Sequence, residues 1–91
     1  MYIIKQTSRF KSSFKKYKSD KRFKSKVFES VLESLRVGDK LDIKYRDHQL
    51  SGEAANLREC HIAPDILLIY EIKENELILL LVDIGSHSKL F

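Results

Sequence analysis

The chain has 91 residues, of which 43% are hydrophobic and 33% are charged, and this composition predicts a single globular domain over residues 1–91. Its single cysteine excludes an internal disulfide and a cysteine-rich zinc module, and its apolar run from Ile78 to Val82 is too short to cross a bilayer. The amino terminus lacks the apolar run of a signal peptide, so we expect a cytoplasmic protein.

The two halves of the chain carry opposite charge. Residues 1–46 hold 14 Lys and Arg against 5 Asp and Glu, whereas residues 47–91 hold 3 against 8, which together make the net charge of +4. Seven of the twelve residues from Lys15 to Lys26 are basic. Such a density attracts nucleic acid or an acidic protein segment, although a solvated helix face gives the same pattern.

In chain order, the first predicted elements are a strand and two helices. Residues 2–5 are typical of a short strand at the margin of a sheet. Ser8 is the expected N-cap of one helix and Asp20 that of a second, and apolar residues follow each cap at helical spacing. Gly38 fits the position just after the second helix. We expect a helical hairpin with one apolar and one cationic side.

The second half of the chain favours strands. Residues 39–55 have an irregular pattern, which predicts a connection that packs on the core. Residues 57–62 alternate as a strand does, and residues 66–70 and 77–82 are apolar on both faces, as interior strands are. The tail beyond Gly85 is too short for another element. The predicted fold is α+β with the order β-α-α-β-β-β, a helical hairpin packed on one face of a small antiparallel sheet.

The candidate chemistry centres on three histidines, His48, His61 and His87, which all lie in the second half. Histidine changes charge near neutral pH, so the three suggest proton transfer, metal binding or phosphate chemistry. Strand alternation places Glu59 and His61 on one face, and Asp65 follows just past a turn. The same pattern also fits ordinary surface and turn residues.

A metal site would draw on the histidines together with Cys60 and Asp65. No pair of these candidate ligands has a recognised close spacing, and Cys60 points to the opposite face of its strand from His61. We therefore expect neither a metal nor another cofactor.

Metal-free cleavage of RNA makes smaller demands. It needs a base for the 2′-hydroxyl, an acid for the leaving oxygen and a cation for the charge on the phosphorane. The histidines with Arg46 and Arg58 would provide such a set. Phe91 either stacks on a base, as aromatic residues do in single-stranded RNA recognition, or docks on the core.

Five sequence blocks carry a resemblance to a known family. They are Tyr45 to Gly52, Arg58 to Ile62, Pro64-Asp65, Leu67 to Tyr70 and Gly85 to Phe91. In this order they resemble the YafQ branch of the RelE toxin superfamily over the last fifty residues. The resemblance implies a type II toxin, an mRNA endoribonuclease that acts in the ribosomal A site. It also implies a cognate antitoxin, with operator DNA bound only through the toxin-antitoxin complex.

The resemblance further implies roles for individual residues. The catalytic histidines are His48, His61 and His87, Asp65 supports them, and Phe91 contacts RNA. We assign to His87 the proton exchange at one end of the scissile bond. His61, positioned by Asp65, and His48 serve the other end and the phosphate charge.

Two positions depart from the family pattern. Ile66 stands where relatives often carry Trp, and Asp83 stands where they usually carry Arg. An anion beside a phosphate removes transition-state stabilisation, so Asp83 predicts reduced activity unless Arg46 or Arg58 compensates, and Asp83→Arg should raise cleavage. The alternative function is a catalytically weak homologue that binds antitoxin and nucleic acid.

Overall fold

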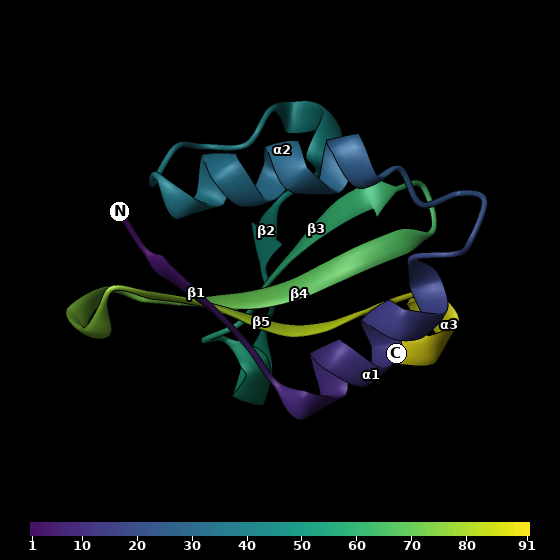
Figure 1. The fold of residues 1–91 in the computed structure, drawn as a ribbon. Coiled ribbons are helices and arrows are strands. Elements are labelled where there is room, and N and C mark those ends of the chain that lie inside the picture. The colour runs from purple at the N-terminus through teal and green to yellow at the C-terminus, as the bar shows by residue number, and fades with distance from the viewer.

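A five-stranded mixed sheet forms the centre of the molecule in the computed structural model, which describes residues 1–91 (Figure 1). The strand order is β1-β5-β4-β3-β2. The strands are β1 (Ile3–Gln6), β2 (His48–Gln49), β3 (Arg58–Ala63), β4 (Ile66–Lys73) and β5 (Ile78–Gly85). The α-helices are α1 (Ser8–Tyr17), α2 (Ser25–Arg36) and α3 (His87–Leu90), and single 3₁₀ turns occupy Ile43–Tyr45, Gly52–Ala54 and Glu74–Glu76. The α+β class is confirmed.

The sheet differs from the prediction in the direction of one strand. β1 pairs with β5 in parallel, from Ile3 opposite Ile78 to Gln6 opposite Leu81, whereas the other three pairs are antiparallel. A parallel pair needs a long crossover, and here almost the whole chain lies between the two strands. The predicted antiparallel sheet is therefore wrong for its first strand.

The ends of the helices differ from the sequence prediction at their amino termini. Thr7, one residue before the predicted cap, accepts the α1 capping hydrogen bond from the Phe10 amide at 3.0 Å. α2 begins at Ser25, because the Asp20 carboxylate instead accepts hydrogen bonds from the amide and guanidinium of Arg22. Gly38 adopts a φ of +84° just past α2, as its predicted position after the helix requires.

The core lies between the helical hairpin and one face of the sheet. Phenylalanine rings from both helices and their connection pack together with centroids 5.2–6.3 Å apart, namely Phe10, Phe14, Phe23 and Phe28. Cys60 and Ile62 of β3 belong to the same hydrophobic cluster. Burial raises the pKa of the Cys60 thiol, so this cysteine is a packing residue and not a reactive one.

Two short elements were not predicted. β2 forms within the segment expected to be irregular, where it pairs only with Glu59 and Arg58. α3 forms in the tail, so the prediction that the tail is too short for another element is wrong. Its cap, Ser86, accepts a hydrogen bond from the Lys89 amide. Figure 1 shows α3 and the carboxy terminus beside α1, at the far end of β5. The longest helix has 12 residues, and none of the helices is long and apolar enough to cross a membrane.

Candidate functional site

Glu59 lies between two of the three histidines. The β2–β3 register places His48 opposite Glu59, and His61 lies two residues further along the same face of β3. The Nε2 atoms of both imidazoles are 3.7 Å from Glu59 Oε1. Glu59 is only 5% exposed, whereas the side chain of His48 is 53% exposed. Either contact is an ion pair when the imidazole is protonated.

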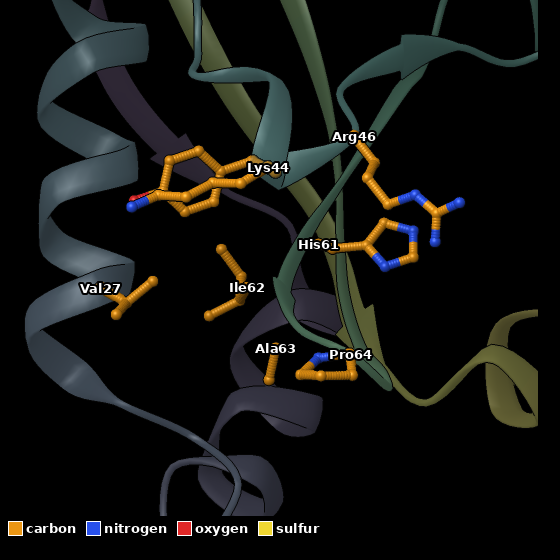
Figure 2. A pocket seen from close by; sticks show the side chains of 8 residues that line it. Val27, Lys44, Arg46, His61, Ile62, Ala63 and Pro64 are labelled. Carbon is orange, nitrogen blue, oxygen red and sulfur yellow. The ribbon is translucent and has the colours of Figure 1, made fainter.

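Arg46 completes this group, which we call the edge cluster (Arg46, His48, Glu59 and His61). The backbone carbonyl of Arg46 lies 2.8 Å from His48 Nδ1. Because a carbonyl only accepts, Nδ1 carries the proton and Nε2 faces Glu59. Arg46 itself adopts a left-handed φ of +53°, which is uncommon for a residue other than glycine. Figure 2 shows its guanidinium beside the ring of His61, and both side chains line one pocket.

A second group, the tail cluster, consists of Arg22, Asp65, His87 and Phe91. Asp65 Oδ1 accepts a hydrogen bond from the backbone amide of His87 at 3.2 Å, and its Oδ2 accepts one from Arg22 at 3.2 Å. The rings of His87 and Phe91 are in contact, with centroids 5.1 Å apart. Phe91 is 63% exposed, so it is not docked in the core.

The sheet register brings the two clusters to the same end of the molecule. His61 pairs with Leu67 across β3 and β4, and Leu67 pairs with Gly85 across β4 and β5. His61 and Gly85 are thus two strand spacings apart, about 10 Å. His87 follows Gly85 by two residues. The register therefore places His61 nearer to the tail cluster, while His48 lies one strand further out, opposite Glu59. The prediction that Asp65 positions His61 is not met by a contact, because Asp65 binds His87 and Arg22 instead.

Asp83 is buried away from solvent, with 7% exposure, in a network with Ser13 and Lys89. Its Oδ1 accepts hydrogen bonds from Ser13 Oγ at 2.7 Å and from the Ile84 amide at 2.8 Å. Lys89 Nζ lies 3.4 Å from the same oxygen and also donates to Ser13 Oγ. The charge of Asp83 is thus paired within a contact that joins α3 to α1.

Arg58 is held in a separate ion pair. Its guanidinium donates to Asp47 Oδ2 at 2.9 Å, and the hydroxyl of Tyr70 donates to the other oxygen of Asp47. The hydrogen bond with Asp47 raises the pKa of Arg58, and burial together with Asp47 raises that of Tyr70. Since alternate residues of a strand point to opposite faces, Arg58 lies on the other face of β3 from Glu59. This predicted RNA contact is therefore not beside Glu59 and the histidines, although Arg58 lines a second pocket together with Arg46.

The edge cluster also contains a residue that sequence reasoning did not include in the site. Alternation had placed Glu59 on the face of His61, but its central position depends on His48, which arrives through β2. A two-residue strand has no periodicity of its own, so β2 could not be predicted from the sequence. The only signal for a site at Glu59 was the charged and polar character of Arg58-Glu59-Cys60-His61.

Comparison with known proteins identifies the family. The model of the YafQ family, bacterial toxins of type II toxin-antitoxin systems, matches residues 2–91. A metal-bound toxin from Helicobacter pylori is 40% identical, with a TM-score of 0.91 over 100% of both chains. A copper-bound mutant toxin from the same organism is 36% identical, with a TM-score of 0.92 over 100% of both chains. No curated protein matches the chain.

A more distant structure agrees with the fold. YafQ from Escherichia coli, in its complex with DinJ, is 23% identical, with a TM-score of 0.86 over 100% of this chain and 99% of that one. The fold is thus that of these small toxin domains. The chain belongs to the YafQ family of type II toxins.

Proposed function

We propose that this toxin is a ribosome-dependent endoribonuclease that cleaves mRNA in the A site without a metal ion. The observation that carries the proposal is the edge cluster, where a buried carboxylate lies 3.7 Å from two imidazoles beside an arginine. Proton transfer by such groups and charge stabilisation by the arginine are what phosphodiester cleavage needs. The tail cluster supplies a third imidazole on the same end of the sheet.

The reaction uses the RNA's own hydroxyl. The 2′-oxygen attacks the adjacent phosphorus and the bond from phosphorus to the 5′-oxygen breaks, leaving a 2′,3′-cyclic phosphate and a 5′-hydroxyl. One of the two edge imidazoles, His61 or His48, takes up the single 2′ proton, with Glu59 as its carboxylate partner. His87 returns a proton to the leaving oxygen. Arg46 stabilises the charge that builds on the phosphorane.

The partners follow from the charge and the family. The basic segment from Lys15 to Lys26 suits ribosomal RNA, with an affinity that falls as salt rises. A cognate antitoxin is supported by the solved complex of E. coli YafQ with DinJ. We expect its acidic part to cover the basic surface and operator DNA to be bound only through that complex. The reaction is placed in the cytoplasm, where ribosomes are.

The direct test offers the purified toxin an mRNA on programmed ribosomes and maps the ends of the products. We expect cuts within the A-site codon, with a cyclic phosphate on the upstream fragment. Free mRNA is the matched control and should be cut far more slowly. If ribosome-bound mRNA stays intact at toxin excess, the endoribonuclease proposal is wrong.

A metal arm belongs in the same experiment, because two H. pylori relatives have been solved with a metal. In this chain no group of three His, Cys, Asp or Glu side chains is arranged to hold a metal ion, and the proposed mechanism uses none. EDTA should leave the cleavage rate unchanged. Loss of cleavage in EDTA and its return with added metal would overturn the metal-free mechanism.

The alternative is a catalytically weak toxin that acts by binding antitoxin and nucleic acid. It is suggested by Asp83, an anion at a position where the family resemblance leads us to expect a cation, although Lys89 pairs with this charge in the structure. Growth arrest on expression separates the two functions. The enzyme predicts arrest that His87→Ala relieves, whereas the binding protein predicts the same growth with either form.

A further inference from the structure

The pocket beside His61 adjoins the proposed acid-base chemistry, with which it shares His61 and Arg46. It has a volume of about 410 Å³, which is within the usual range of ligand pockets, about 300–1,000 Å³. Its lining comes from α2, from the turn before β2 and from the end of β3, namely Val27, Lys44, Tyr45, Arg46, His61 and the segment from Ile62 to Pro64.

The pocket exists because β2 is short. β2 pairs only with Glu59 and Arg58, so the outer edge of β3 carries no strand from Cys60 onward. Residues that point to opposite faces of β3 are therefore both reachable from this edge. Figure 2 shows the result, with Val27, Ile62 and Ala63 on one side of the space and His61 with Arg46 on the other.

The walls and the rim have different chemistry. Val27, Tyr45 and Ile62 offer apolar and aromatic surface. Lys44 and Arg46 bring two positive charges, and Lys44 Nζ lies 5.3 Å from the centre of the Tyr45 ring. No acidic side chain is among the lining residues. An apolar and aromatic surface next to two cations suits a nucleotide, because the planar base packs on the surface and the phosphate pairs with the cations.

We infer that this pocket is a subsite for one RNA base next to the scissile phosphate, and that it sets sequence preference. The inference rests on the proposed function. The base packs against the apolar wall formed by Val27 and Ile62, and its phosphate is held by Lys44 and Arg46. Because His61 belongs to both the pocket wall and the edge cluster, the bound nucleotide is placed directly beside the reacting bond.

The test uses two variants, each of which reduces the volume of the pocket from one side. Val27→Phe fills it from α2, and Ala63→Val adds bulk from β3 with a residue that strands favour. In each variant we expect the cleavage rate at mRNA sites with a purine in this pocket to fall about tenfold relative to the rate at sites with a pyrimidine. Small changes in pocket size change the preference between two substrates by about this factor. Val37→Phe, just past α2 and outside the pocket, is the matched control and should keep the wild-type pattern.

The rim of the pocket, formed by Lys44 and Arg46, is tested by the salt dependence of RNA binding. Lys44→Gln should weaken binding of all RNA sequences alike and reduce the slope of log affinity against log salt by about one, as loss of one phosphate contact does. A change in base preference with this variant, or no change in the slope, would contradict the phosphate assignment.

A binding measurement keeps the test independent of turnover. The wild-type toxin is titrated with a short 2′-O-methyl RNA, which cannot be cleaved, while the methyl NMR signals of Val27 and Ala63 are followed. These signals should shift with the intact oligonucleotide and not with one that has an abasic site. Equal shifts with both oligonucleotides would overturn the subsite.

The outcomes distinguish the two proposals. If wild-type toxin cuts no mRNA on ribosomes, the proposed function fails whatever the variants do. If it cuts mRNA and Val27→Phe behaves as Val37→Phe does, the enzyme stands and the base subsite is wrong.

Discussion

The edge cluster and the tail cluster use the same residue types in opposite ways. In the edge cluster Glu59 is 5% exposed and both neighbouring imidazoles approach the same oxygen. In the tail cluster the Asp65 side chain is 52% exposed, and Phe91 stands in solvent. The first site is built into paired strands, whereas the second rests on one helical turn held by a few polar contacts. We therefore expect mutations in the edge cluster to change the cleavage rate by removing a reacting or charged group. Mutations in the tail cluster should also change the rate by displacing α3.

The largest effect should come from the imidazole of the tail. His87→Ala removes the proposed proton donor for the leaving oxygen, so cleavage on ribosomes should slow by about 10²–10⁴-fold. Ser88→Ala, the next residue of α3, is the control and should cleave at the wild-type rate. Full activity of His87→Ala would remove the tail cluster from the mechanism.

A smaller loss is expected at the edge. Glu59→Gln keeps the shape of the side chain but removes its charge, so the two imidazoles lose their anionic partner. We expect cleavage to fall by about 10²-fold, at the lower limit for a general acid or base. Glu71→Gln on β4 serves as the matched change. Equal rates for the two variants would show that Glu59 is only a structural carboxylate.

Asp83→Arg tests how the tail is held. From sequence this change should raise cleavage, but the contacts with Ser13 and Lys89 predict the opposite. An arginine there would face Lys89 and break a buried hydrogen bond, so the free energy of unfolding should drop by about 1–3 kcal/mol. Denaturant unfolding and ribosomal cleavage measured together decide the matter.

Asp83→Asn is the companion variant, because it keeps an acceptor for Ser13 while losing the pair with Lys89. Its unfolding midpoint should lie between those of wild type and Asp83→Arg. If Asp83→Arg is as stable as wild type and cuts faster, the position acts on phosphate after all.

The smallest effect concerns the exposed ion pair behind the tail. Hydrogen bonds from Arg22 lower the pKa of Asp20 from 3.8 to about 2. A lowered pKa in the folded state means that this contribution to stability is present above pH 3.8 and is lost as the pH falls through about 2. Arg22→Gln should return the Asp20 midpoint towards 3.8, as followed by NMR of its carboxyl carbon. An unchanged midpoint would mean that the pair is absent in solution.

Sequence reasoning succeeded where a pattern repeats locally. The helices follow from apolar spacing, and the shared face of Glu59 and His61 follows from strand alternation. It failed where a contact joins distant residues. Asp20 was expected to cap a helix, but its carboxylate binds Arg22, and the capping role near α1 belongs to Thr7.

The same limit applies to the site. The position of His48 depends on pairing across a loop, and α3 depends on Lys89 reaching Ser13 on α1. Neither contact produces a periodic pattern of residues from which it could be predicted. The sequence itself singled out the three histidines and the shared face of Glu59 and His61, whereas the position of His48 opposite Glu59 follows only from the pairing of β2 with β3.

The parallel pairing of β1 with β5 has a consequence for synthesis. β1 has β5 as its only neighbour, and Thr7 donates a hydrogen bond to the carbonyl of Val82, 75 residues later. Contacts of such long range form late in folding. The first strand of a nascent chain has no place in the sheet until the last strand has emerged, and α3 follows that strand directly. The pairing of β1 and the placement of His87 on α3 therefore both wait for residues 78–90.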